Sequence, residues 1–265
     1  MRHERPNSFD SASAVVTGAG QGIGAAIARA LAREGAHVVL NGRHGDKLEQ
    51  VCEAIRADGG TADCRAGDVT DLAHLRELMA LAAGDRGVIE ILVNNAGIAG
   101  PTSPLADVEP EEWEETIAIN LTGVFLACKA ALPYLRRAQR GKIVNIGSVT
   151  GKQPLPNRSP YAAAKLGVVG LTRTLALELG PSGMSVNVIS PWLVEGQRLT
   201  DVIASMSRER GLTPEQLRAE MTQGTAFKRT VSESDVVETT LFLCSPSADG
   251  LTGQDINVAA GAVMY

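Results

Sequence analysis

Short apolar runs recur along the chain, separated by longer stretches in which apolar residues return with helical spacing. The runs are rich in valine and isoleucine and apolar on both faces, which is typical of strands buried in a parallel sheet. We predict seven such strands, at residues 14–17, 37–40, 61–65, 88–93, 142–146, 185–189 and 254–258. The helices expected between them span residues 25–34, 46–57, 71–83, 111–137 and 161–179, and Ser159 is expected to cap the last one. The predicted fold class is therefore α/β: a doubly wound Rossmann-type domain, with a seven-stranded parallel sheet and helices on both faces.

The whole chain, residues 1–265, is expected to form a single domain. Residues 1–10 are polar and predict a short flexible tail. Residues 193–229 are too long for a simple connection, and within them Thr213-Pro214-Glu215-Gln216 has the pattern of a capping box. We interpret this insertion as a helical loop over a substrate site, with a surface excursion that contacts no substrate as the alternative.

Composition argues against several classes of function. Aromatic residues make up only 3% and the formal net charge is -5, so no nucleic-acid partner is expected. No apolar run approaches the roughly 20 residues that span a bilayer, so no membrane partner is expected. The four cysteines are far apart and form no CxxC pair, which argues against a zinc site or a disulfide framework. We expect reduced thiols in a cytoplasmic protein that holds no metal.

A glycine-rich turn follows the first predicted strand. Gly18, Gly22 and Gly24 allow a sharp bend and a close approach of the backbone to a pyrophosphate, at which the following helix directs its free N–H groups. Gln21 and Ile23 complete the turn and are expected to contact the same cofactor. The spacing differs from the usual dinucleotide fingerprint, so the prediction depends on the position of the turn between a strand and a helix.

The residues after the second predicted strand bear on the choice of cofactor. Folds that prefer NAD place an acid about 20 residues past the glycines, where it binds the ribose 2′-hydroxyl. Here no acid occurs until Asp46, whereas Arg43 offers a cation for a 2′-phosphate. We predict that NADP(H) is preferred and that NAD(H) is the second choice. The alternative is that Arg43 lies on the adenine or in solvent.

A serine, a tyrosine and a lysine in the second half of the chain offer acid–base chemistry. Tyr161 and Lys165 are four residues apart on a predicted helix, so they share one face about 6 Å apart along the axis. The ammonium favours the phenolate and lowers the pKa of a phenol, and it can also reach a nicotinamide ribose. Ser148 directly follows the fifth predicted strand, where its hydroxyl can hold a substrate oxygen. The set predicts an oxidoreductase that interconverts a secondary alcohol and a ketone, with Tyr161 as general acid/base.

Over residues 13–265 the chain resembles the short-chain dehydrogenase/reductase family. The matching residues are Thr17-Gly-Ala-Gly-Gln-Gly-Ile-Gly24, Asp68-Val69, Asn94-Asn95-Ala96-Gly97, Asn120, Ser148, Tyr161-Ala-Ala-Ala-Lys165 and Ser190-Pro191. The resemblance implies that Asp68 and Val69 meet the adenine, and that Asn95, Ala96 and Gly97 line the cofactor and steady the sheet.

The resemblance has further implications. Asn120 would bend its helix and hold a water that links Lys165 to solvent, which completes a proton relay. Pro191 would line the cofactor with the residues after it. The protein would be a homo-oligomer, a tetramer formed through the helices at residues 111–137 and 161–179. Internal burial of these helices explains their apolar surface equally well.

Three departures from the family pattern lie near the end of the predicted cofactor site. Trp192 stands where a glycine is usual, Gly196 replaces a threonine, and Ala259-Ala260-Gly261 replaces an Asp-Gly-Gly sequence. Val194 is expected to present its backbone to the nicotinamide amide in place of that threonine. Trp192 is expected either to wall the substrate pocket or to fill the core.

The substrate is less determined than the reaction. The expected substrate contacts are Ser148, Trp192, Gln153, Arg158 and Arg198. Cationic residues near the predicted mouth motivate a polyol, sugar acid or other anionic substrate; they are Lys152, Arg158, Arg198, Arg208, Arg210 and Arg218. The alternative is a solvated face balanced by nearby carboxylates.

Two other functions fit the same fold. One is a nucleotide-binding regulator without turnover, and the other is a lyase or isomerase that uses a bound nicotinamide transiently. The intact serine, tyrosine and lysine favour an enzyme that acts on a small-molecule alcohol or ketone.

Overall fold

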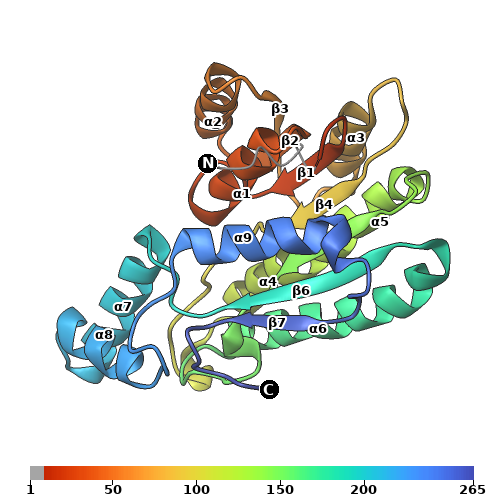
Figure 1. The fold of residues 1–265 in the computed structure, drawn as a ribbon. Helices are drawn as coiled ribbons and strands as arrows, with labels where there is room; N and C mark the ends of the chain where they lie inside the picture. Colours follow the sequence, from red (N-terminus) through yellow and green to blue (C-terminus); the bar gives the residue numbers. More distant parts are fainter. Residues whose placement is uncertain (1–8) are drawn as a thin grey trace.

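Seven parallel strands form one sheet in the order β3-β2-β1-β4-β5-β6-β7 in the computed structural model, which describes residues 9–265 (Figure 1). The strands are β1 (Ser13–Thr17), β2 (His37–Gly42), β3 (Thr61–Ala66), β4 (Ile91–Asn94), β5 (Lys142–Ile146), β6 (Ser185–Pro191) and β7 (Asp255–Val258). The predicted seven-stranded parallel sheet is confirmed, with strand ends that shift by a few residues at most.

Helices pack on both faces of this sheet. They are α1 (Gly22–Arg33), α2 (Gly45–Ala57), α3 (Leu72–Ala83), α4 (Pro110–Ile117), α5 (Gly123–Leu135), α6 (Ser159–Leu179), α7 (Gln197–Arg210), α8 (Pro214–Gln223) and α9 (Glu233–Cys244). One apolar core joins the sheet to α1, α2 and α9, and a second joins the opposite face to α3, α5 and α6. In β1, Ala14 and Val16 belong to the first core and Val15 to the second. Successive residues of a strand point to opposite faces, which is why the strands are apolar throughout.

Two helix starts differ from the sequence-based expectation. Helix α9 was not predicted, although Ser232 and Asp235 form a capping box in which each side chain accepts a hydrogen bond from the backbone N–H of the other. The predicted cap at Ser159 is wrong. Helix α6 begins at that residue, so its hydroxyl lies within the first turn, where it is buried and has no hydrogen-bond partner in the described part of the chain.

The long helix predicted at residues 111–137 is present but interrupted. Helices α4 and α5 are joined by a π-helical turn, Ala118–Thr122, with Asn120 at its centre. The Asn120 amide donates to the carbonyl of Thr116, four residues back, at 3.0 Å. A side chain that bonds to this carbonyl competes with the regular helical ladder, and π turns of this kind are frequent at functional sites.

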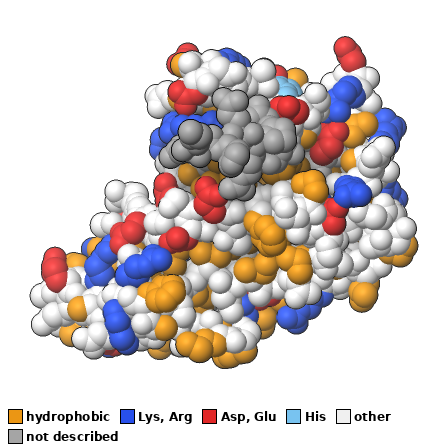
Figure 2. All heavy atoms as spheres, in the orientation of Figure 1, with side chains coloured by type: hydrophobic (Ala, Val, Ile, Leu, Met, Phe, Trp, Pro, Cys, Tyr) orange, Lys and Arg blue, Asp and Glu red, His pale blue; other side chains and the backbone are white. Residues whose placement is uncertain are grey.

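The insertion forms α7 and α8, which project from one end of the sheet (Figure 1). The predicted capping box of α8 is present, since Thr213 and Gln216 exchange side-chain-to-backbone hydrogen bonds. The two helices share a small core that includes Leu199, Ile203 and Leu217. Acidic and basic side chains are interspersed over this region in Figure 2, while apolar side chains gather nearer α9.

The prediction of a flexible N-terminal tail holds only in part. Most of the predicted tail, residues 1–10, lies outside the described residues, but Phe9 is buried in the core beside α1 and is therefore not part of a tail.

One helical stretch, Pro110–Leu135, is long and apolar enough to cross a membrane by length and composition alone, which the apolar runs in the sequence did not predict. Its residues Val124, Ala131 and Leu135 are buried in the core with α3, and core helices commonly meet the same criteria. The absence of a membrane partner stays a prediction.

Gly24 allows α1 to pass directly over the turn that follows β1. A Cβ atom at this position would lie 2.3 Å from the carbonyl oxygen of Gly18 and 2.4 Å from the amide nitrogen of Asn95. Both neighbours are held in place, the first because it is backbone and the second because it is hydrogen-bonded across the sheet. Only glycine fits here without a displacement of α1.

We predict that Gly24→Ala lowers the free energy of unfolding by about 2 kcal/mol or more, because the added methyl group overpacks a backbone contact. Urea denaturation of the purified variant measures the change. Gly45→Ala is the matched control: its Cβ would meet only the Cβ of Ala66, at 3.6 Å, and its stability should stay within about 0.5 kcal/mol of the wild type. Equal stability of the two variants would contradict the close approach.

Candidate active site

A cleft of about 580 Å³ lies at the carboxyl ends of the central strands. It opens beside β1 and β4, where the chain switches from one half of the sheet to the other, and ligands of such sheets bind at this switch point. The cleft brings together the residues predicted to serve cofactor, substrate or chemistry, except Asn120, Gln153 and four of the mouth cations, Lys152, Arg208, Arg210 and Arg218. Segments far apart in the chain thus meet at one site.

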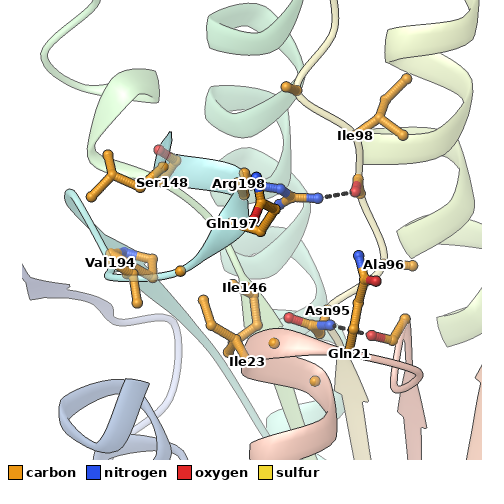
Figure 3. Close-up of a pocket in the computed structure, with 18 of the residues that line it drawn as sticks. Gln21, Ile23, Asn95, Ala96, Ile98, Ile146, Ser148, Val194, Gln197 and Arg198 are labelled. Atoms are coloured by element: carbon orange, nitrogen blue, oxygen red, sulfur yellow. Dashed lines mark hydrogen bonds between the residues drawn. The ribbon is translucent and has the colours of Figure 1, made fainter. Parts of the chain in front are cut away.

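The glycine turn presents the open end of α1 to the cleft. Gly18 and Gly22 have φ of 65° and 53°, in the left-handed region that favours glycine. Gln21 precedes the helix without a side-chain cap, and the first turn contains no acidic residue. The free N–H groups and the positive end of the helix therefore remain available to an anion such as a pyrophosphate. Gln21 and Ile23 lie at this end of the cleft (Figure 3).

Asn95 ties the glycine turn to β4. Its amide donates to the carbonyls of Thr17 and Gly18 at 3.1 and 3.0 Å. In return, the Thr17 hydroxyl accepts from the backbone N–H groups of Asn95 and Ala96, both at 3.1 Å. These four bonds join the ends of two adjacent strands, so the expected role of Asn95 in steadying the sheet has a structural basis.

Arg43, Asp68 and Val69 lie together at the end of the cleft where the adenosine of a dinucleotide would bind. Arg43 is exposed and makes no ion pair with a carboxylate within residues 9–265. Burial raises the pKa of Asp68, but hydrogen bonds from the backbone and hydroxyl of Thr70, both at 2.8 Å, lower it below its ordinary value overall. Asp68 is thus a fixed carboxylate that can accept a hydrogen bond.

Other residues at this end of the cleft were not foreseen. Asn41 is buried at the end of β2, where an NAD-binding fold would place an acid, and its amide donates to the carbonyls of Arg65 and Gly67 at 3.2 Å. Lys47, in the first turn of α2, also lines the cleft and donates to the side chain of Gln21 at 3.0 Å. The available signal was a second basic residue shortly after the end of β2.

Tyr161 and Lys165 face the cleft from the first turns of α6. Lys165 is buried, its ammonium donates to the carbonyl of Ile146 at 2.8 Å, and it lies 5.7 Å from the centre of the Tyr161 ring. Ser148 follows β5, and its hydroxyl accepts from the backbone N–H of Thr150 at 3.1 Å, which leaves the hydroxyl proton free to donate. The predicted set therefore converges in space.

Burial raises the pKa of Tyr161, but nearby groups more than offset this effect. The Lys165 ammonium contributes most to lowering it, followed by the guanidinium of Arg198, the hydroxyl of Ser148 and the guanidinium of Arg158. The net result is a pKa below the ordinary value for tyrosine. Burial also lowers the pKa of Lys165, against the opposing influence of Tyr161. Two groups that titrate far above neutral pH in water are thus brought closer to neutral pH.

Asn120 lies behind the cleft instead of lining it. Its amide also donates to the carbonyl of Ile98 at 3.1 Å, while its Oδ1 is buried and has no hydrogen-bond partner among the described residues. A Cβ on Gly97 would lie 2.5 Å from this oxygen and 3.6 Å from the Lys165 ammonium, so both polar groups flank the same glycine. This arrangement fits the expected water between Asn120 and Lys165.

The cleft therefore has the features that a nicotinamide dinucleotide needs. One end offers an uncapped helix N-terminus, and the other offers a buried ammonium beside a phenol. No group of three side chains suited to hold a metal ion gathers within residues 9–265.

Comparison with known proteins agrees with this geometry. The sequence model of the short chain dehydrogenase family matches residues 12–207, which is most of the chain. The chain belongs to the short chain dehydrogenase family. It is 36% identical over 252 residues to a D-beta-hydroxybutyrate dehydrogenase of Rhizobium meliloti, and the match covers 94% of this chain and 97% of that protein. It is 38% identical over 254 residues to a cis-4-hydroxycyclohexanecarboxylate dehydrogenase of Sinomonas cyclohexanicum, with coverage of 96% and 97%.

Solved structures of the family have the same fold as this short chain dehydrogenase. A variant of actinorhodin polyketide ketoreductase with NADPH superposes with a TM-score of 0.91, at 36% sequence identity, and the match covers 96% of this chain and 98% of that one. An NAD+-bound xylitol dehydrogenase superposes with a TM-score of 0.92, at 28% identity, with coverage of 96% and 99%. The predicted family, the Rossmann-like fold and the assignment as an oxidoreductase are confirmed.

Two of the family departures shape the substrate side of the cleft. Trp192 lines the cleft and also packs against the small core of Val149, Ala259 and Val263, while its contact with a substrate stays a prediction. Val194 lines the cleft and forms a parallel bridge with Val231, which fixes the backbone that was expected to meet the nicotinamide amide.

Several predicted substrate residues are placed elsewhere. Gln153 is exposed and does not line the cleft, so its assignment as a substrate contact is wrong; the chain stays buried through Thr150 and reaches the surface only after that residue. Lys152 pairs with Asp255 at 2.9 Å, and Arg218 pairs with Glu195 at 2.6 Å. Two more of the predicted mouth cations, Arg208 and Arg210, are exposed and lie outside the cleft. Only two of the predicted mouth cations, Arg158 and Arg198, remain in the cleft.

The insertion also contributes apolar residues to the cleft, which the sequence analysis did not name. They are Leu199 and Val202 of α7 and Met221 of α8, and Leu155 joins them from the segment before α6. Arg198, in the first turn of α7, reaches across the cleft and donates to the carbonyl of Gly97 (Figure 3). The insertion therefore lines the cleft, and its contact with a substrate stays a prediction.

We predict that Lys165→Met raises the pKa of Tyr161 by about one to three units, because a positive charge that favours the phenolate is removed. In the wild type the phenolate forms as pH rises through the lowered pKa, so in the variant it forms only at higher pH. The measurement is an ultraviolet titration of the phenolate, with the titration of the matching Tyr161→Phe protein subtracted to remove Tyr134 and Tyr265.

Lys129→Met is the control, because Lys129 is an exposed cation of α5 that does not line the cleft. Its Tyr161 should titrate as in the wild type. A Tyr161 titration that is the same with and without the Lys165 ammonium would contradict the coupling between the two groups.

Proposed function

We propose that this short chain dehydrogenase interconverts a secondary alcohol and a ketone and prefers NADP(H) as its cofactor. The observation that carries the proposal is the position of Tyr161, which shares one cleft with the glycine turn and has its pKa lowered by the buried Lys165. The names of relatives agree with this reaction class, since they include a hydroxybutyrate dehydrogenase, a hydroxycyclohexanecarboxylate dehydrogenase and a putative ketoacyl reductase.

In the proposed reduction, Ser148 donates a hydrogen bond to the carbonyl oxygen of the substrate, and Tyr161 donates a proton to the same oxygen. The bound nicotinamide supplies the hydride. Lys165 stabilises the phenolate that Tyr161 becomes, and it binds the nicotinamide ribose. In the oxidation the same groups act in reverse, so the phenolate of Tyr161 accepts the proton of the alcohol.

Tyr161 must regain its proton after each reduction. The Lys165 ammonium has three N–H donors, and one of them bonds to the carbonyl of Ile146. A water held by the free Oδ1 of Asn120 would connect another donor to solvent, which gives Asn120 a role in proton relay without contact with the substrate. Buried polar atoms without a protein partner commonly hold such a water.

The preference for NADP(H) rests on charge at the end of β2. Three basic side chains line the cleft there, Arg43, His44 and Lys47, and the last side chain of the strand, that of Asn41 before Gly42, is neutral. A dianionic 2′-phosphate would be attracted to this group, whereas a ribose 2′-hydroxyl finds no carboxylate at the usual position. The related structures include one with NADPH and one with NAD+, so they do not favour either cofactor. The proposed preference therefore rests on the basic side chains of this chain after β2.

We predict that Tyr161→Phe lowers turnover of a secondary alcohol or ketone by about 100-fold or more, because the variant has no proton to transfer. Binding of NADPH should change by less than about threefold, since the phenol hydroxyl makes at most one of many contacts with the cofactor. Turnover is followed by nicotinamide absorbance, and binding by the fluorescence of NADPH.

Tyr134→Phe is the control, because Tyr134 packs in the core formed by α3, α5 and α6 and does not line the cleft. Unchanged turnover in Tyr161→Phe would favour a function that does not use the phenol. Turnover without any net change in nicotinamide absorbance would indicate a lyase or isomerase instead.

We predict that Arg43→Ala weakens NADPH binding by about tenfold or more, because a charge-assisted contact with the 2′-phosphate is lost. NADH binding should change by less than about twofold, since NADH lacks that phosphate. Both dissociation constants can be measured by calorimetry. Arg33→Ala, at an exposed arginine that pairs with Asp58, should leave both unchanged. Equal weakening of the two cofactors would place Arg43 on the adenine and remove the basis for the preference.

A further inference from the structure

Arg158 is a buried cation without a carboxylate partner among the described residues. Only 4% of this residue is exposed, and its Nη1 donates to the hydroxyl of Thr102 at 3.0 Å. It makes no ion pair within the part of the chain that the structure describes, residues 9–265. A guanidinium has five N–H donors, and Thr102 accepts one of them. Buried charges are normally paired, because an unpaired one is strongly unfavourable.

The groups that act on Arg158 confirm that no carboxylate is near. Burial lowers the pKa of Arg158, Tyr161 raises it, and the neighbouring Arg198 lowers it further. The other cations of the region differ in this respect, since Lys152 and Arg218 both have carboxylate partners. The substrate side of the cleft therefore carries two positive charges that the described chain leaves unbalanced.

The position of Arg158 relates it to the reacting oxygen. Its guanidinium carbon lies 4.9 Å from the centre of the Tyr161 ring, and the residue lines the cleft. Arg198 lies across the cleft from Gln21 and Ile23, which mark the phosphate end (Figure 3). The unbalanced charge of Arg158 therefore lies beside the ring of Tyr161, the residue that would protonate the substrate.

We propose that the substrate is a hydroxy acid, or the corresponding keto acid, whose carboxylate pairs with Arg158. This inference rests on the proposed alcohol–ketone oxidoreductase function. A planar carboxylate matches the fork of a guanidinium, and its single negative charge balances that of the buried Arg158. Arg198 is a second, exposed cation that keeps a donor free beside its bond to Gly97. The remainder of the substrate would contact the apolar wall formed by Leu155, Val202 and Met221.

The first test compares keto acids with their own methyl esters. The panel contains straight-chain keto acids with different spacings between carboxylate and carbonyl, and one ring keto acid, each reduced with NADPH. We expect the acid to exceed its ester in kcat/KM by roughly 10- to 100-fold for the best spacing, because one charge-assisted pair is lost in the ester.

Arg158→Met should abolish this preference, whereas Arg158→Lys should keep part of it. The ratio of acid to ester is the readout, since any change in the pKa of Tyr161 affects both substrates alike. Arg208→Met is the control, because Arg208 is exposed and outside the cleft, and it should keep the wild-type ratio. An unchanged ratio in a folded Arg158→Met protein would overturn the proposal.

A binding measurement keeps the test independent of turnover. Cyclohexanecarboxylate should bind the complex of the enzyme with NADP+ at least about tenfold more tightly than its methyl ester, and this difference should disappear in Arg158→Met. A failure of the carboxylate to bind would overturn the inference. If the carboxylate does not bind but uncharged ketones are still reduced, the proposed oxidoreductase function stands and only the substrate inference fails. If no ketone is reduced at all, the proposed function itself fails. If a phosphate monoester binds more tightly than any carboxylate, the hydroxy-acid proposal is overturned in favour of a phosphorylated substrate.

Discussion

The buried ammonium of Lys165 is the interaction on which the rest of the site depends. It is buried beside Tyr161, where it donates a hydrogen bond to the carbonyl of Ile146 and lies near the buried Oδ1 of Asn120, which has no partner among the described residues. A charge in such a place is tolerated only if nearby groups accept its protons, and its field then acts on the phenol with little screening. The acid–base property of Tyr161 is thus a consequence of where α6 meets the end of β5.

Close backbone contacts fix this meeting point. Asn95 and Thr17 join the ends of β1 and β4 through four hydrogen bonds, and Gly24 lets α1 lie against the same turn. On the other side, the π turn aims Asn120 at Gly97, where only a glycine leaves room for its side chain. These contacts leave the cleft little freedom to change shape, which suits groups that must be held in place for catalysis.

Charge is distributed unevenly along the cleft. Lys165, Arg158 and Arg198 surround Tyr161, and at the opposite end the N-terminus of α1 and Arg43 are also positive. The cleft supplies few carboxylates to balance them, whereas three cations of the insertion, Arg210, Arg218 and Arg229, are paired with acids on the surface. A dinucleotide can neutralise the phosphate end, and an anionic substrate can neutralise the other. The imbalance is a property of the site itself, since the formal net charge of the chain is -5.

Local patterns in the sequence were sufficient for the sheet, most of the helices and the residues of the glycine turn, because these depend on periodicity and on spacings within one element. They also placed Tyr161 and Lys165 on one helical face. The failures at Ser159 and Gln153 have a common reason: where a helix begins and where a loop turns outward depends on packing against distant segments. Which cations remain unpaired could likewise not be read from the sequence, since Lys152 finds its partner in Asp255, about 100 residues later. The sequence by itself determined the fold class and the candidate catalytic groups, and only the tertiary structure decided that Arg158 is buried without a counter-charge, because pairing across a fold depends on which distant elements come into contact.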